Sequence, residues 1–323
     1  MLRARPNPLV HDSSSTQRIM LLVCVALLPN ILASTFIFGY RALMLYAVSI
    51  LACVLTEHVA CKLMKIPLST SDLSAAVTGI LFAAMLPVET PYWMVIFGAI
   101  IAIGVVKMLF GGIGYNFANP AIVARIVLII AFPSVMASYS VLPQFAADAN
   151  LEGQLALGAD TVSSATPLAL IKNGQEVDYM TLILGTHAGS IGEVSILALA
   201  IGAVFLLITR VIEPWIPFTF IASAVLGAWA LGGDPMLHLL SGGLILGACF
   251  MANDYTTSPI TTKGKIIYGI GCGLITAFVR VAGFAAEGVA FAILFMNLLT
   301  PSIDKLCATN PLGGVKRVLS KQK

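Results

Sequence analysis

Long apolar runs constrain the fold of this chain more than any other feature. A membrane-spanning helix needs roughly 20 mostly apolar residues, and the sequence holds eight runs of about that length: residues 19–37, 42–64, 91–110, 120–138, 194–212, 215–231, 266–282 and 288–306. Two shorter runs, 74–86 and 236–252, lead into segments with proline. The pattern predicts an all-α polytopic membrane protein with ten transmembrane helices.

The composition excludes most other classes of protein. Only 10% of the 323 residues are charged and 59% are hydrophobic, whereas a soluble domain carries roughly 25% charged residues. An ordinary soluble enzyme and a disordered scaffold are therefore excluded. A net charge of +3 without a basic stripe argues against nucleic-acid binding. The six cysteines show no C-x-x-C spacing, so we interpret them as small core hydrophobes and expect no metal site.

Lysine and arginine predict the orientation in the membrane. With a cytoplasmic N-terminus, all but three of the 18 basic residues fall on the inner side; the exceptions are Arg41, Lys172 and Arg280. The positive-inside rule therefore places both termini in the cytoplasm. In this orientation the one long loop, residues 139–192, lies outside the cytoplasm.

The two halves of the chain resemble each other. Five expected helices precede the long loop and five follow it, and each half contains a short helix and a glycine-rich break. An odd number of helices per copy forces opposite orientations, so we expect two inverted five-helix repeats with broken helices, at 1–138 and 193–308. Residues 309–323 form a cytoplasmic basic tail.

The first break, residues 110–120, is a candidate binding site. It holds Gly112, Gly114, Asn116 and Asn119 before a proline. Broken backbone near the bilayer is tolerated where it faces protein or a cavity, and amide side chains both donate and accept hydrogen bonds. That suits a flat heterocycle such as a flavin. A turn with asparagine caps before a helix explains the pattern equally well.

The second break and two carboxylates are further candidates. Asp254 and Thr257 belong to a hydroxyl-rich segment that could bind a cation or a polyol, or only cap helices. Glu57 lies well inside the second run, where a carboxylate needs a partner or a task, and Asp304 lies near the inner end of the last run. For both, a local ion pair with a lysine near the cytoplasmic face is the alternative to a functional role.

The outer loop carries two motifs. Ser163, Ser164 and Thr166 belong to a small-residue turn that leaves the threonine hydroxyl open to modification. Gly189 and Ser190 precede the sixth expected helix, where glycines and free backbone N–H groups favour an anion such as a phosphate. A flexible entry with a capping serine explains that second motif as well.

Three segments together resemble a known family. Ser-x-Ala-Thr-Pro-Leu, Gly-Gly-x-Gly-x-Asn-x-x-Asn-Pro-Ala and Asn-Asp-x-x-Thr-Ser-Pro-x-Thr-x-x-Gly are similar to segments of the RnfD component of the Rnf complex, and of the related NqrB component of the sodium-translocating NADH:quinone reductase. The likeness spans nearly the whole chain. Its short N-terminal segment favours the Rnf component.

The resemblance implies cofactors and partners. It implies FMN attached by a phosphodiester to Thr166, installed by a dedicated flavin transferase, and a second, non-covalent flavin, riboflavin or FMN, at Asn116 and Asn119. Ser164 stands where the family often has glycine, and it stays small. The resemblance also makes Glu57 and Asp304 ion-coupling candidates, because they occupy places where related subunits carry acidic groups. Five other Rnf subunits would be partners, in a prokaryotic inner membrane.

The function expected from this resemblance is electron transfer between ferredoxin and NAD⁺, coupled to translocation of Na⁺ or H⁺. The chain itself shows no nicotinamide site and no cluster-ligand spacing, so we expect one subunit of an oxidoreductase and no complete catalytic site. The alternatives are a small-solute channel or secondary transporter, because inverted repeats with broken helices are typical of transporters, and a structural membrane anchor.

Overall fold

The computed structural model describes residues 15–66, 70–141, 162–163, 179–185, 187–193, 195–283 and 288–308. Within these ranges the regular secondary structure is helical except for one pair of two-residue strands, β1 (Ser140–Val141) and β2 (Val162–Ser163). The strands are antiparallel, with Ser140 opposite Ser163. The expected all-α class therefore holds apart from this short pair.

The first half contains long helices followed by shorter ones. Its elements are α1 (Thr16–Phe38), α2 (Tyr40–Met64), η1 (Thr70–Asp72), α3 (Ser74–Ala84), α4 (Tyr92–Ala99), the π-helix η2 (Ile100–Met108), α5 (Pro120–Ala131) and α6 (Pro133–Met136). Ser15 caps α1 by accepting a hydrogen bond from the Arg18 N–H group. Gly39, at a φ of 76°, ends α1 and lets the chain reverse into α2.

The rest of the chain is also helical, beginning with a short helix in the long loop. Its elements are α9 (Tyr179–Leu184), α10 (Ile196–Ile208), α11 (Trp215–Ala230), α12 (Pro235–Leu240), α13 (Leu244–Leu246), the π-helix η4 (Gly247–Met251), α14 (Thr262–Ala282) and α15 (Gly288–Leu306). Side chains that accept from the first turn begin three of these helices: Ser195 for α10, Asp234 for α12 and Thr261 for α14.

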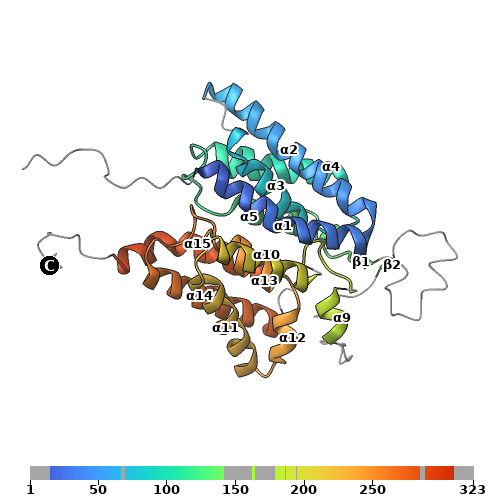
Figure 1. Ribbon diagram of the computed structural model, residues 1–323, viewed down its shortest axis with the longest axis vertical. Coiled ribbons are helices and arrows are strands. Elements are labelled where there is room, and N and C mark those ends of the chain that lie inside the picture. Colours follow the sequence, from blue (N-terminus) through green and yellow to red (C-terminus); the bar gives the residue numbers. More distant parts are fainter. Residues whose placement is uncertain are drawn as a thin grey trace, which may run out of the picture.

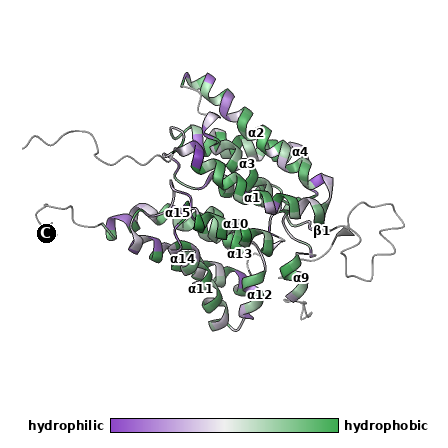
Figure 2. Ribbon diagram, viewed as in Figure 1, coloured by the Kyte–Doolittle hydropathy of each residue, from purple (hydrophilic) through white to green (hydrophobic). Residues whose placement is uncertain are grey.

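The helices carry the apolar surface of a membrane protein. Four of them, α1, α2, α14 and α15, are long and apolar enough to cross a membrane, and five apolar helices of 10–17 residues accompany them. Figure 2 shows helix bodies that are largely hydrophobic, with hydrophilic stretches mostly near helix ends. Large apolar side chains such as Phe36, Ile208 and Phe218 are about three-quarters exposed. These faces suit contact with lipid.

Two of the expected runs are interrupted. Run 120–138 is divided at Phe132, because Pro133 lacks an N–H group and begins a new short helix, α6. Run 236–252 is divided into α12, α13 and η4, because Gly242 and Gly243 adopt positive φ angles that end a right-handed helix. Each other expected run coincides with one helix, or with α4 continued by η2.

The two halves meet along α1 and α10, and the helices of each half pack on one another (Figure 1). A Cβ atom on Gly202 of α10 would lie 2.2 Å from the Ala26 carbonyl oxygen of α1, so only glycine permits this approach. In the first half the Ser49 hydroxyl of α2 donates to the Gly79 carbonyl of α3 at 2.7 Å. Small residues thus bring helix backbones close together, as they do in membrane bundles generally.

Candidate functional site

The two sequence breaks, more than 130 residues apart, line one cavity between the halves. The cavity has a volume of about 350 Å³, within the range of small-molecule sites, roughly 300–1,000 Å³. Gly114, Asn116 and Asn119 line it from the first break, and Asp254 from the second. Apolar side chains of α1, α3, α10 and η4 form most of the remaining wall.

Asn119 and Asn116 have different roles in the first break. Asn119 caps α5: its Oδ1 accepts from the Ala121 N–H group at 3.0 Å, with Pro120 as the first helical residue. Its Nδ2 donates to the Met251 carbonyl at 3.3 Å and so joins the two breaks. Asn116 lies before the helix, and its buried Oδ1 has no hydrogen-bond partner among the described residues. The capping and ligand interpretations are therefore compatible.

The glycines of the first break fit an approach to a ligand. Gly112 and Gly114 have φ angles of 92° and 94°, which other residues rarely adopt, and a Cβ atom on either would meet nothing within 4 Å. Gly114 lines the cavity, whereas Gly112 is not among the lining residues. The backbone of Gly114 is therefore accessible from the cavity, with no side chain covering it.

In the second break, Asp254 organises a turn at the cavity edge. Its carboxylate accepts from the Thr256 hydroxyl at 3.2 Å and from the Thr257 hydroxyl at 3.4 Å. Asn253 beside it lines the cavity and donates to the Ala248 carbonyl at 2.9 Å, which ends η4. Asp254 therefore supplies the one acidic side chain among the described residues that line the cavity.

Thr257 and Asp304 connect this break to α15. Thr257 is buried outside the cavity lining, and its carbonyl accepts from the Thr300 hydroxyl of α15 at 2.9 Å. Asp304 accepts from the Ile260 N–H group at 3.1 Å. Both contacts hold the break against α15, and the roles of Thr257 in cofactor binding and of Asp304 in ion coupling stay predictions.

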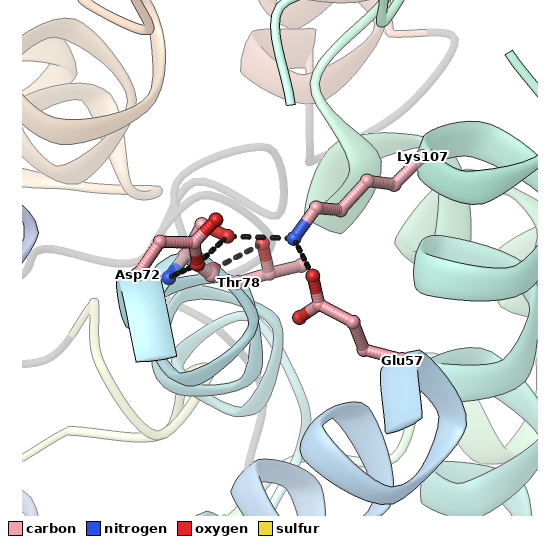
Figure 3. A network of polar contacts seen from close by, with 5 residues as sticks. Glu57, Asp72, Thr78 and Lys107 are labelled. Carbon is pink, nitrogen blue, oxygen red and sulfur yellow. Dashed lines mark hydrogen bonds and ion pairs between the residues drawn. The ribbon is translucent and has the colours of Figure 1, made fainter. Parts of the chain in front are cut away.

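A buried ion pair includes one residue of the cavity lining, Lys107, and Figure 3 shows it from close by. Lys107 Nζ of η2 lies 2.7 Å from Glu57 Oε1 of α2 and 2.6 Å from the Ser74 hydroxyl of α3. The Ser74 hydroxyl in turn donates to Asp72 at 2.6 Å. Lys107 and Ser74 line the cavity, and Glu57 is not among the lining residues. Glu57 is therefore paired with a lysine, but with Lys107 of η2, 50 residues away, and not with the local lysine that the sequence offered as the alternative.

The sequence interpretation missed Lys107, Ser74 and Asn253 as cavity residues. Lys107 had counted only as one of the cytoplasmic cations, and Ser74 only as the start of a short run. A signal was available: a lysine inside an otherwise apolar run is costly unless it is paired. Its partner could not be deduced, because Glu57 lies 50 residues earlier.

The outer motifs are described only in part. Ser164 and Thr166 lie outside the described residues, and Ser163 is described only as the end of β2. In the loop before α10 the Ile191 and Gly192 N–H groups donate to the Leu86 and Ala84 carbonyls at 2.9 and 2.7 Å. These donors join the loop to the end of α3 and are not left free for an anion.

The same loop buries Ser190 completely and packs Gly189 into the interior. Nearby His187 contacts the Thr181 carbonyl at 3.4 Å, and burial lowers the pKa of its imidazole from 6.5 to about 4. Anion binding by Gly189 and Ser190 stays a prediction.

A flavin fits the cavity chemically. The ring system needs an apolar slot with a few hydrogen-bonding groups at its edge. The cavity offers an apolar wall, the unpartnered Asn116 oxygen and the bare backbone of Gly114. A metal centre has less support, since no cluster of three His, Cys, Asp or Glu side chains occurs in the part of the chain that the structure describes.

Comparison with known proteins gives one consistent result. The model of the NQR2, RnfD, RnfE family matches residues 3–313. The D subunit of the Na(+)-translocating ferredoxin:NAD(+) oxidoreductase complex of Acetobacterium woodii is 40% identical, over 98% of this chain and 96% of the relative. The D subunit of the Proton-translocating ferredoxin:NAD(+) oxidoreductase complex of Clostridium ljungdahlii is 38% identical, over 93% and 92%. The D subunit of the Ion-translocating oxidoreductase complex of Erwinia tasmaniensis is 37% identical, over 94% and 95%.

Proposed function

The chain belongs to the NQR2, RnfD, RnfE family, and we propose that it is the RnfD-type membrane electron-transfer subunit of an Rnf complex. The complex would couple electron transfer between ferredoxin and NAD⁺ to ion translocation. The relatives include one named for sodium and one named for protons, so the proposal covers both ions. The other subunits of such a complex would be its partners.

One observation carries the redox part of the proposal. Two breaks from opposite halves of the chain meet at one cavity, where the buried Asn116 oxygen has no partner among the described residues. A buried acceptor without a partner costs roughly 1–3 kcal/mol, so a ligand donor at that point would recover it. Asn116, the Gly114 backbone and Asn253 would hold a non-covalent flavin, riboflavin or FMN.

A bound flavin would supply the redox chemistry, and the protein would supply position and electrostatics. Asn119 would hold the two cavity walls in fixed relative positions, because its amide joins the start of α5 to the end of η4. Asp254 and its threonine partners would fix the edge of the cavity. The apolar wall would keep water away from the site.

We further propose FMN linked through a phosphodiester to Thr166, transferred by a flavin transferase. The Ser163–Ser164–Ala165–Thr166 sequence supports this proposal through the family motif. Small neighbours would leave the threonine hydroxyl accessible to the transferase.

The membrane arrangement proposed is ten spans in two inverted repeats, with both termini cytoplasmic. Helix contacts support it. In the first half α2 packs on α3, α4 and η2, and in the second half α11 packs on α12, α13 and α14. The halves meet through α1 with α10 and α5 with α15. The two contacts between the halves each join an element to its counterpart in the other half, as a pseudo-twofold axis predicts.

Flavin detection tests the function directly. The purified complex is denatured and separated on a gel, and the released flavin is quantified in parallel. We expect a fluorescent band for this subunit, lost in Thr166→Ala and kept in Thr161→Ala, a matched threonine of the same loop. We also expect released flavin from the wild-type complex, reduced in Asn116→Ala. A dark band and no released flavin would favour a channel or transporter.

A further inference from the structure

The Glu57–Lys107 ion pair is almost completely buried, and a contribution to folding stability alone does not explain why two charges lie there. The two side chains are 0% and 2% exposed, and they join α2 to η2 within a largely apolar interior. Removing two charges from water costs several kcal/mol each, and apolar residues of similar volume often stabilise a core better. Retention of such a pair points to a task for one of its members.

The position of Lys107 shows which member faces the cavity. Lys107 lines the cavity together with Ser74, whereas Glu57 is not among the lining residues. Lys107 is the one cationic side chain among the described residues that line the cavity. A positive charge fixed at the wall of a low-dielectric site acts strongly on any charge that arises inside.

The surroundings of Lys107 hold it in this place. Ser74 accepts a hydrogen bond from the ammonium group and donates one to Asp72, which also accepts from the Ser74 N–H group at 2.8 Å (Figure 3). The backbone carbonyl of Lys107 accepts from the Gly112 N–H group at 3.0 Å. The lysine is therefore tied to the first break at its backbone and to two other helical segments at its side chain.

We propose that Lys107 supplies the counter-charge for the reduced ligand of this cavity, with Glu57 and Ser74 as positioning residues. The inference rests on the proposed non-covalent flavin. Each electron that enters the cavity adds one negative charge, and the ammonium group of Lys107 stabilises it without any proton transfer. Glu57 balances Lys107 while the ligand is oxidised and moderates its effect. Lys107 thereby raises the reduction potential of the bound ligand.

The test is a redox titration of the complex in a Thr166→Ala background, in which this subunit would hold only the non-covalent flavin; the signal is read as the difference between variants of this subunit. Lys107→Met should lower the midpoint potential of the bound flavin. We expect the equilibrium constant for reduction to fall roughly tenfold, which is about 59 mV for a one-electron couple. Lys107→Arg should restore most of it. Glu57→Gln removes the opposing charge and should shift the potential upward.

Flavin content is measured on the same samples. If Lys107→Met does not assemble, the neutral pair Glu57→Gln/Lys107→Met replaces it and is compared with Glu57→Gln alone. Unchanged potentials at full flavin content, or shifts of the same sign in Lys107→Met and Glu57→Gln, would show a purely structural pair and overturn the proposal. A wild-type complex that releases no flavin would instead refute the proposed function, and this inference with it.

Discussion

Lys107 Nζ lies 2.7 Å from Glu57 Oε1 although 50 residues separate the two in the sequence. The pair joins α2 to η2 in the first half of the chain, and Lys107 also lines the cavity. Its two members depend on each other, because either charge left alone would be buried without compensation.

We expect single neutralisation of this pair to be costly. Glu57→Gln or Lys107→Met should each lower the free energy of unfolding by about 3–5 kcal/mol, since each leaves one buried charge. The double variant should recover much of that loss. Denaturation of the purified protein in detergent measures the cycle, and additive losses in the double variant would contradict direct pairing.

Asn116 and Asn119 offer a matched pair of amides. Asn119→Ala removes a helix cap and the link to Met251, so it should lower stability by about 1 kcal/mol or more as well as flavin content. Asn116→Ala removes an atom that has no described protein partner, so it should lower flavin content and leave thermal stability nearly unchanged. Extracted flavin and melting temperature are measured together. Equal stability losses in both variants would argue that Asn116 is structural.

The contact of α1 with α10 predicts a strong effect of one methyl group. Gly202→Ala places a Cβ atom 2.2 Å from the Ala26 carbonyl oxygen, and overpacking of this kind costs typically about 1–3 kcal/mol. Because α1 and α10 both line the cavity, flavin content should fall as well. Gly104→Ala is the control, since its nearest neighbour would be Thr56 at 3.7 Å. A tolerated Gly202→Ala would mean that the two helices can separate freely.

The sequence predicted the course of the helices well and their contacts poorly. Apolar length located most runs to within a few residues, because lipid demands continuous helices. It did not predict the divisions at Pro133 and at Gly242–Gly243, which one proline and two positive φ angles impose. The breaks were recognisable from their glycines and amides, since polar backbone at membrane depth is rare.

The pairing of residues across the fold could not be derived in the same way. Lys107 faces Glu57 because α2, α3 and η2 pack together, and η2 is a π-helix, whose extra residue per turn changes the direction of its side chains. Asp304 and Thr257 looked like site residues because of their chemistry, yet their described contacts brace the second break. Residue type identified polar segments, and tertiary packing decided which polar atoms face the cavity.

His187 predicts a dependence of stability on pH. Burial lowers the pKa of its imidazole to about 4, against 6.5 in the unfolded chain. Between these values the unfolded state binds more protons than the folded state, so the free energy of unfolding should fall as the pH drops from about 6.5 to 4. Thermal unfolding of the wild-type protein is compared with that of His187→Asn. A slope that persists unchanged in the variant would assign it to other groups.

The proposed orientation predicts that residues on the two sides of the membrane differ in their accessibility to a reagent added outside the cell. Lys263 at the start of α14 and Tyr40 at the start of α2 are both exposed, and the excess of basic residues places the first in the cytoplasm and the second outside. Single cysteines, Lys263→Cys and Tyr40→Cys, are treated in intact cells with a thiol reagent that cannot cross the membrane. Tyr40→Cys should react at once and Lys263→Cys only after the membrane is opened. The reverse order would invert the topology and place the cavity-lining breaks on the outer side, away from cytoplasmic electron donors.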